Sequence, residues 1–598
     1  MTDRTLRIGG ASGFWGDAAR ATPQLLGEEL DFIVYDYLAE ITMSIMARAR
    51  AKDDSRGYAT DFVSAAMKPH LALIAERGVR VISNAGGVNP HACVAALQAE
   101  IAAQGLELSV ACVSGDDLMD RLGQFADSTE MFSGAAFPDA DQVLSVNAYL
   151  GAFPIARALD LGADIVVTGR CVDSAVTLGA CIHTFGWQRQ DHDRLAMGSL
   201  AGHILECGPQ ATGGNFTDWE DVAGLANIGY PIAEIHADGS FDCSKPAGSG
   251  GLVSVGTVCE QMLYEIGDPQ AYILPDVTCD FSTAVVEQLG ENRVRVSGAT
   301  GRPAPDSYKV CATFADQFRG GTYLSFYGID ADRKARALGA AVFEAARNTL
   351  RAFELADFTE TSLEVLGTES QYGDFSEVDG AREVVLKIAA KHADMIGIGI
   401  LLKEAVGLGL ATPPGLSGFA GSRPGPSPVV RLFSCTVPRD SVPVTVQFAG
   451  ARHACDEAHG QPLDSAPPQR PPAPQCEPFE DAVEVPLVRL AWGRSGDKGD
   501  KANIGIIARQ ARYLPYIWAA LSEEQVSARF AHFLASTGPG SVERFLLPGS
   551  HAINFLLHDV LGGGGVASIR NDPQGKGYAQ LLLSCPIAVP AQLARELS

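Results

Sequence analysis

The sequence predicts an α/β protein with a Rossmann-like, mostly parallel sheet in its N-terminal region, an α+β middle region and a small α+β C-terminal domain. Short apolar runs alternate with Ala-rich segments of helical periodicity over the first 230 residues. The pattern then changes to a mixture of strands and long helices. A proline-rich stretch finally separates the last part of the chain from the rest.

The N-terminal strands are predicted from apolar runs that each end in a cluster of Gly, Asp, Asn or Arg. These runs are residues 5–10 (TLRIGG), 31–37 (DFIVYDY), 79–87 (VRVISNAGG), 106–115 (LELSVACVSG) and 163–170 (ADIVVTGR). Ligands of parallel sheets bind beyond the carboxyl ends of the strands. The loops that follow these runs are therefore where chemistry is expected.

The remainder of the chain is divided by its proline content. Between residues 231 and 455, strands are predicted at 293–301 and 321–329 and a helix at 331–356. Residues 462–478 carry seven prolines, which is typical of an extended spacer. The predicted units are residues 1–455 (1–230 and 231–455), a linker at 456–483, and a domain at 484–598 with strands near 485–492, 502–508, 553–561 and 579–587.

Charge and composition limit the partners. The 598 residues carry a formal charge of −25, which repels nucleic acid and anionic membrane surfaces. We expect neither as a partner. An anionic ligand, such as a small carboxylate or an acyl-CoA, would need local helix N-termini, backbone N–H groups or a few cations. The sequence leaves a homo-oligomer open.

Cysteine and histidine usage favours a cytoplasmic protein without a recognisable metal site. The thirteen cysteines are odd in number and include no C-x-x-C pair, and the twelve histidines show no ligand grouping. The N-terminus lacks the apolar segment of a secretory signal, and no apolar run is long enough to span a bilayer. No metal is predicted, and no cofactor is identified.

The loop after the first strand, GGASGFWGDAAR, resembles a dinucleotide fingerprint only in part. Its glycines stand at positions 10, 13 and 16 instead of in G-x-G-x-x-G spacing, although Asp36 lies 20 residues beyond Gly16. A tight turn with Asp17 as helix N-cap is the favoured alternative. Asp36 and the nearby Glu40 are candidates for acid/base chemistry.

The loop SNAGGVNPHACVAAL favours a helix start, with Asn89 as N-cap and Pro90 in the first turn. Backbone N–H groups of Asn84, Gly86 and Gly87 could form an anion or oxyanion site ahead of that helix. An ordinary glycine turn with a helix cap explains the same residues.

The loop VVTGRCVDSAVTLGA places Arg170, Cys171 and Asp173 between a strand and a helix that Asp173 or Ser174 would cap. A cysteine beside an arginine at a helix N-terminus has its thiolate favoured, as a nucleophile or acid/base thiol requires. The alternative is a small buried hydrophobic residue.

Two further loops hold candidate binding residues. Residues 202–219 (GHILECGPQATGGNFTDW) include Gln210, Thr212 and Asn215, which suit either a functional loop or a structural connection between domains. RSGDKGDKANIG, from Arg494 to Gly505, matches neither a Walker loop nor an EF-hand. It favours a strand–loop–strand connection with glycine at positive φ, or a loop whose Arg494 and Lys498 face a partner or an anionic ligand.

Several of these segments together resemble the acyclic terpene utilisation AtuA family. They are GGASGFWGD, DYLAE, SNAGGVNP, TGRCVDSAVTLG, ECGPQATGGNFTDW and RSGDKGDKANIG, which span nearly the whole chain. The resemblance implies a large AtuA region up to about residue 455 and a small ferredoxin-like C-terminal domain. It also implies a role in the degradation of citronellol and geraniol through acyl-CoA intermediates, but it supplies no catalytic residues.

Two functional hypotheses follow. The first is an enzyme that acts on a branched acyl-CoA or carboxylate by hydration, lyase or acyl-transfer chemistry, which needs a base and an oxyanion site. Asp36, Glu40 and Asp173 would be acid/base groups, and Cys171 an acid/base thiol or nucleophile. The second is a non-catalytic subunit or scaffold of an acyl-CoA-processing complex. A dehydrogenase is disfavoured by the glycine spacing.

Overall fold

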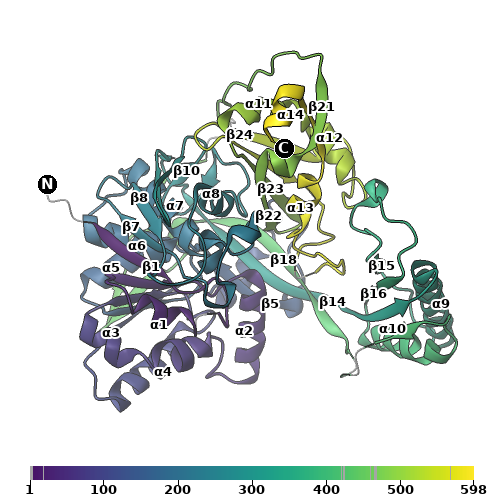
Figure 1. Cartoon of the computed structure of the whole chain (residues 1–598). Helices are drawn as coiled ribbons and strands as arrows, with labels where there is room; N and C mark the ends of the chain where they lie inside the picture. The colour runs from purple at the N-terminus through teal and green to yellow at the C-terminus, as the bar shows by residue number, and fades with distance from the viewer. Residues whose placement is uncertain are drawn as a thin grey trace.

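Figure 1 shows the computed structural model of the chain, which describes residues 5–17, 19–418, 421, 424–457, 459–463, 468–565 and 567–597. A large sheet with helices forms the main body, and long strands lead from it to a separate lobe. The C-terminal domain lies between these two parts. Within the described ranges, no helix is long and apolar enough to cross a membrane.

The main sheet has eleven strands among the described residues, in the order β11-β12-β8-β7-β1-β2-β3-β6-β4-β19-β20. Its centre is parallel and is built by β1 (Leu6–Gly10), β2 (Phe32–Tyr35), β3 (Arg80–Ser83), β6 (Ile165–Thr168) and β4 (Val110–Ser114). The predicted parallel sheet is confirmed.

Antiparallel strands extend both edges of this parallel centre. One edge carries β7 (Ile232–Ile235), β8 (Phe241–Ser244), β12 (Arg293–Ser297) and β11 (Val285–Gly290), and the other β19 (Thr445–Phe448) and β20 (Ala451–Ala454). One sheet therefore continues across residue 230. A separate small sheet contains β9 (Tyr272–Ile273), β10 (Thr278–Asp280) and β13 (Thr300–Arg302).

Helices cover both faces of the sheet because its strands are apolar on both sides. In β2, Phe32 and Val34 enter one core and Ile33 and Tyr35 the other, as the two-residue period of a strand requires. The first core contains α5 (Phe153–Asp160), α6 (Ala175–Phe185), α7 (His192–Leu205) and α8 (Val255–Met262). The second contains α1 (Ala21–Leu25), α2 (Glu40–Lys52), α3 (Leu71–Arg77) and α4 (Pro90–Ala103).

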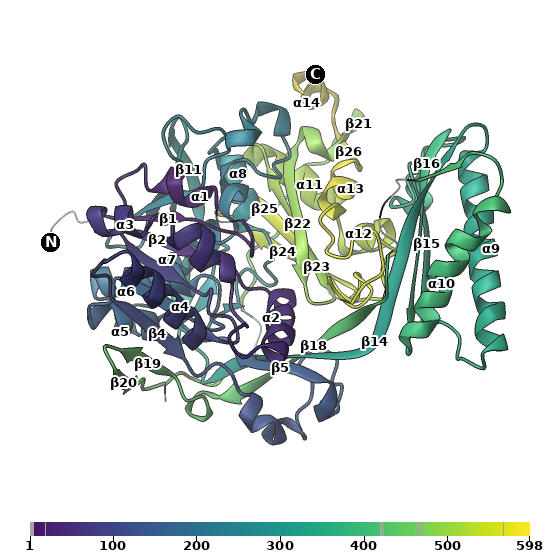
Figure 2. The same cartoon turned by 90° about the horizontal axis from the view of Figure 1, so that it is seen from below.

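A long strand connects the main body to the lobe. The start of β14 (Ser307–Tyr327) pairs with β5 (Val143–Ala148), and β18 (Ser427–Pro438) runs beside it (Figure 2). Its far end pairs with β16 (Glu383–His392) and β17 (Leu416–Ser417). The lobe is completed by β15 (Glu360–Leu366) and the helices α9 (Ala331–Ala352) and α10 (Met395–Gly407), which pack on the sheet.

The C-terminal domain has a four-stranded antiparallel sheet in the order β22-β23-β25-β24. The strands are β22 (Ala491–Lys498), β23 (Lys501–Ala508), β25 (Ala552–Leu557) and β24 (Val542–Leu547). Its helices are α11 (Leu514–Ala520), α12 (Glu523–Arg529), α13 (Tyr578–Leu583) and α14 (Ala591–Glu596), and β21 (Ala482–Pro486) pairs with β26 (Pro586–Pro590).

Two predicted strands of this domain differ in the structure. Residues 485–492 are divided by a 3-10 turn between β21 and β22, which belong to different sheets. The run 579–587 forms most of α13 and the start of β26. Leu581, Leu582 and Leu583 all enter the domain core, and a short apolar run of this kind does not distinguish a helix from a strand.

The C-terminal domain is fixed to the main body next to α8. The Asn503 side chain accepts a hydrogen bond from Glu265 N at 2.8 Å and donates one to Leu263 O at 2.5 Å. Asn554 donates to Ile266 O and Gly267 O at 3.1 and 2.7 Å. These bonds join a buried face of β23 and β25 to the main body, and so determine where the β22–β23 hairpin lies.

Candidate functional site

Several of the predicted site residues meet beyond the carboxyl ends of the parallel strands. Asp36 follows β2, Asn84 follows β3 and Arg170 follows β6. Asn84 Nδ2 donates a hydrogen bond to Asp36 Oδ1 at 2.5 Å, and Tyr37 N donates to Asn84 Oδ1 at 2.8 Å. The Asn84 amide therefore fixes the Asp36 side chain relative to the neighbouring strand.

Asp36 is a buried carboxyl group at this edge whose pKa is strongly perturbed. It is only 8% exposed, and one of its oxygens is bonded to Asn84. Burial, and then the negative charges of Asp173 and Glu206, raise the pKa of Asp36 well above its ordinary value. Asp36 thus holds its proton to a higher pH than an ordinary carboxyl group, as a general acid requires.

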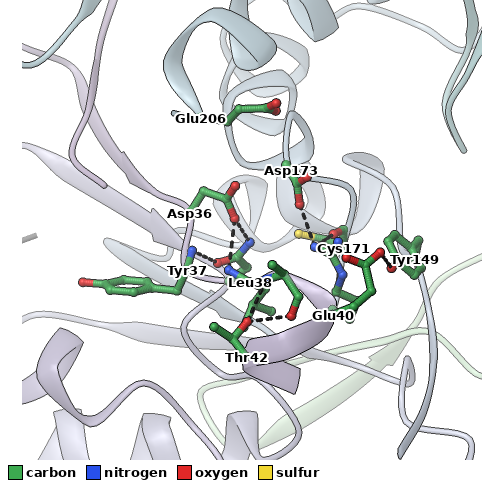
Figure 3. Close-up of polar contacts among 12 residues, drawn as sticks. Asp36, Tyr37, Leu38, Glu40, Thr42, Tyr149, Cys171, Asp173 and Glu206 are labelled. Carbon is green, nitrogen blue, oxygen red and sulfur yellow. Dashed lines mark hydrogen bonds and ion pairs between the residues drawn. The ribbon is translucent and has the colours of Figure 1, made fainter. Parts of the chain in front are cut away.

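Figure 3 shows Asp36, Asp173 and Glu206 grouped together although they come from different elements. Glu206 directly follows α7, and the loop after β1 packs tightly against this turn. A Cβ atom at Gly10 would lie 2.7 Å from Leu205 O, and one at Gly13 would lie 2.9 Å from the Cys207 carbonyl carbon. These glycines thus let the chain approach closely enough to bring Glu206 over the sheet edge.

The same packing opposes a nicotinamide site at the first loop, since the chain itself occupies the space beside these glycines. The predicted Asp17 cap is wrong, because α1 begins only at Ala21 and Arg20 precedes it. Asp17 instead accepts hydrogen bonds from Gly13 N at 3.1 Å and from the Tyr230 hydroxyl.

Arg170 organises the opposite side of the cluster. Its guanidinium forms an ion pair with Asp173 at 2.6 Å and donates to Cys171 O at 2.8 Å. It also lies 4.2 Å from the ring centroid of Tyr149. Arg170 is 4% exposed and Asp173 is 31% exposed, so this ion pair joins a buried guanidinium to a partly exposed carboxylate.

Glu40, at the start of α2, differs from Asp36 in its electrostatics. Tyr149 donates a hydrogen bond to Glu40 Oε1 at 2.7 Å (Figure 3). Burial alone would raise the pKa of Glu40, but Lys309, Arg170 and this hydrogen bond outweigh it and lower the pKa to about 2. Glu40 is therefore a permanent anion and not a proton donor at neutral pH.

Of the two alternatives that the sequence leaves open for Cys171, the structure favours the small buried residue over the reactive thiolate. Burial raises the pKa of its thiol to about 12, an effect that the Thr168 hydroxyl at 3.5 Å and the Arg170 charge only partly oppose. The following helix begins at Ala175 and its N-cap Ser174 makes no side-chain cap bond. The thiol is thus neutral and lies too far ahead of the helix for stabilisation by its N-terminus.

The loop after β3 forms the predicted helix start, since the Asn89 side chain accepts from Ala92 N and Pro90 opens α4. Its expected oxyanion donors are already occupied, which corrects that prediction. The N–H groups of Asn84, Gly86 and Gly87 donate to Tyr35 O, Thr168 O and Asn84 O. Only the Asn84 side chain therefore acts toward the cluster.

The loop of residues 202–219 connects the two domains. The Thr212 hydroxyl is bonded to Gly229 O at 2.5 Å, and Asn215 Nδ2 lies 3.5 Å from Gln210 Oε1. Arg494 donates to Asn215 O at 3.1 Å and stacks on the Tyr264 ring. These contacts favour the structural alternative for the loop.

Lys498 approaches the cluster from the C-terminal domain. It ends β22 beside a two-residue turn in which Gly499 has φ +66, as predicted for this connection. Its side chain is exposed, and no residue in the described part of the chain forms a hydrogen bond or ion pair with its ammonium group.

The surroundings of Lys498 are acidic. Crowding by protein atoms would lower the pKa of Lys498, but nearby acidic groups outweigh this and raise it. In order of effect these groups are Tyr272, Glu265, Asp173 and Glu206. An uncontacted ammonium group among acidic side chains is a natural position for the anionic part of a ligand.

Sequence reasoning missed Asp116, Tyr149 and Lys309. Asp116 follows β4, so the strand-end rule could have found it. It is buried, accepts from Arg170 N at 2.8 Å and Asn147 Nδ2 at 2.9 Å, and burial raises its pKa to about 7. Tyr149 and Lys309 carry no local signal, because they reach the site only through the pairing of β14 with β5.

The described residues include no group of three His, Cys, Asp or Glu side chains that could hold a metal ion.

Comparison with known families agrees with this architecture. Residues 6–448 match the model of the acyclic terpene utilisation family protein AtuA, and residues 485–588 match the AtuA ferredoxin-like domain. No curated protein and no solved structure matches the chain. The chain belongs to the acyclic terpene utilisation AtuA family and ends in the ferredoxin-like domain of that family.

Proposed function

We propose that this protein is an enzyme of acyclic terpene or related branched acyl-CoA catabolism that adds water to, or removes it from, an acyl-CoA or similar carboxylate. The supporting observation is the grouping of Asp36, whose pKa is raised well above its ordinary value, with Asp173, which is ion-paired to Arg170, near the Lys498 ammonium group, which bonds to no described residue. Two carboxyl groups in different electrostatic environments are the requirement for paired general acid and base catalysis.

In the proposed reaction, Asp173 is the general base and Asp36 the general acid. Asp173 accepts a proton from water, whose oxygen bonds to the β-carbon of an α,β-unsaturated thioester. The negative charge develops on the thioester oxygen, where the Lys498 ammonium stabilises it. Asp36 then donates its proton to the α-carbon. Transfer of a proton from Asp173 back to Asp36 restores the starting state, so that one water is added per turnover.

Hydration fits the site better than acyl transfer through Cys171. An acyl-transfer nucleophile would need a thiolate, whereas burial holds the pKa of this thiol at about 12. The backbone N–H groups after β3 also form internal hydrogen bonds and cannot bind an oxyanion.

The test is an assay of the purified protein with branched α,β-unsaturated acyl-CoA esters in deuterated water. Loss of the conjugated thioester absorbance, with one deuterium on the α-carbon, is the expected result. Asp36→Asn and Asp173→Asn should each lower kcat by about 100-fold or more. Asp221→Asn, an exposed acid outside the cluster, is the control. Turnover that persists in both site variants would refute these roles.

A scaffold is the second candidate, and the exposed apolar residues of the lobe favour it. Ile329, Phe353 and Leu410 are 78%, 68% and 104% exposed. Such residues suit a contact with an acyl-CoA-processing enzyme. A stable complex that is lost in Ile329→Ser and Leu410→Ser, together with no turnover of any ester, would favour the scaffold.

A further inference from the structure

A buried imidazole, that of His203, contacts Glu206 of the Asp36–Asp173–Glu206 group, and the proposed reaction does not use it. His203 is in the last turn of α7, and its side chain is only 2% exposed. Its Nδ1 lies 2.8 Å from Glu206 Oε1. The ring packs beside Tyr272 and Phe281, whose centroids are 6.0 and 6.5 Å from it and 5.4 Å from each other. His203 thus has one fixed orientation, with Glu206 as its polar partner.

The other ring nitrogen has no partner. His203 Nε2 is buried and makes no hydrogen bond with any described residue. A buried imidazole held only by a carboxylate at Nδ1 is the arrangement in which a histidine and an acid share a proton and a charge. Packing alone would not explain a polar atom left unsatisfied.

Charged groups couple this pair to the proposed site. The charged groups that act on His203 are Glu206, Lys498 and Glu265, and the Tyr272 ring packs beside it. Glu206 in turn acts on Asp36 and is acted on by Asp173 and Lys498. Glu206 is therefore the link between the imidazole and the proposed proton donor.

We propose that His203 is a positioning residue: its hydrogen bond favours the ionised form of Glu206, whose charge near Asp36 in turn favours the protonated form of Asp36. This inference rests on the proposed role of Asp36 as proton donor.

The direction of each electrostatic effect agrees. Burial alone would lower the pKa of His203, but the Glu206 charge and hydrogen bond outweigh it and raise the pKa. Burial raises the pKa of Glu206 overall, and the His203 charge and hydrogen bond limit that rise. Without a charged imidazole, Glu206 would therefore bind a proton more readily and would repel the ionised form of Asp36 less.

The experiment measures protonation directly and needs no turnover. The full chain is labelled with carboxyl-13C aspartate and ring-15N histidine, and its NMR signals are followed against pH. The Asp36 and His203 signals are identified by their absence in Asp36→Asn and His203→Gln. Glutamine at position 203 keeps a hydrogen-bond donor but removes the charge.

His203→Gln is expected to lower the titration midpoint of Asp36 by about one pH unit. Glu206→Gln should lower the midpoints of both Asp36 and His203. The matched control is His392→Gln, because His392 is also 2% exposed but both of its ring nitrogens lie within hydrogen-bond distance of backbone carbonyl groups in the lobe. This control should leave Asp36 unchanged.

An Asp36 midpoint that stays within the scatter of the control in either variant would overturn the inference. If His203→Gln does not fold, Glu206→Gln decides the question alone. If no acyl-CoA is hydrated, the proposed function fails while these midpoints still decide whether His203 controls Asp36. If hydration is found, His203→Gln should also shift the limb of the kcat–pH profile that reports Asp36 by the same amount.

Discussion

Asp36 has a protonation state that stability measurements can detect. Because burial and neighbouring charges raise its pKa, the folded state binds a proton that the unfolded chain releases above about pH 4. Its contribution to stability is fully present below that pH and is lost as pH rises toward the folded pKa. The raised pKa of Asp36 therefore lowers the stability of the folded state as pH rises, and it also keeps a proton available at the site.

Asp36→Asn, which should lower kcat, should therefore also stabilise the protein at higher pH. The free energy of unfolding of the variant relative to the parent should increase by up to about 1.4 kcal/mol per pH unit between the unfolded and folded pKa values. Thermal unfolding between pH 4 and 8 measures this. A difference that does not change with pH would contradict the protonated state of Asp36.

Glu40 predicts the opposite behaviour, because its pKa is lowered to about 2. Its stabilising contribution is present above the unfolded pKa near 4.3 and is lost as pH falls toward 2. Tyr149→Phe removes the hydrogen bond to this anion and should cost about 1.5–3 kcal/mol at pH 7.

Urea unfolding at pH 7 and at pH 3 checks the Tyr149→Phe effect, which should be smaller at the lower pH. Tyr516→Phe is a suitable control, since the Tyr516 hydroxyl has no hydrogen bond to any residue that the structure describes. An equal cost at both pH values would mean that the anion is not the source of the effect.

At the scale of elements, the loop of residues 202–219 holds the C-terminal domain in place. Asp218 accepts a hydrogen bond from Trp492 Nε1 at 2.7 Å and two from Arg509 at 2.6 Å. These donors lower the pKa of Asp218 despite its partial burial. A bidentate arginine pair of this kind has a defined geometry and is stronger than an ordinary surface pair.

Asp218→Ala should therefore loosen the domain contact by about 1.5–3 kcal/mol, since Trp492 and Arg509 lose their charged acceptor. Limited proteolysis in the linker, residues 468–478, should become faster. Asp221→Ala, an exposed position just after this loop, should be cleaved at the parental rate. Equal rates for all three proteins would exclude this role of Asp218.

How much of the site is predictable depends on which element carries each residue. Asp36, Glu40, Arg170 and Asp173 were predictable because the carboxyl ends of parallel strands meet at one edge of the sheet. Glu206 comes to this edge through the close packing of the β1 loop on the end of α7. The high pKa of Cys171 depends on burial, which its local sequence does not reveal.

At the scale of the whole molecule, the proposed site is complete only when the two family regions are joined. Asp36 and Asp173 belong to the AtuA region, whereas Lys498 belongs to the ferredoxin-like domain. The hydrogen bonds of Asn503 and Asn554 with residues 263–267 determine how the hairpin is oriented. The sequence identified Lys498 as a candidate, but its position among the acids follows from this docking.

Lys498→Met should lower kcat/KM for an acyl-CoA ester by about 100-fold, because a developing oxyanion would lose its one positive partner from this domain. Domain docking should persist, since the Lys498 ammonium bonds to no described residue. The matched control is Lys501→Met, which lies directly opposite on the same hairpin. Steady-state kinetics and linker proteolysis are measured together. Unchanged kinetics for Lys498→Met would show that Lys498 takes no part in the reaction. Faster proteolysis of the linker would show that Lys498 stabilises the contact between the domains instead.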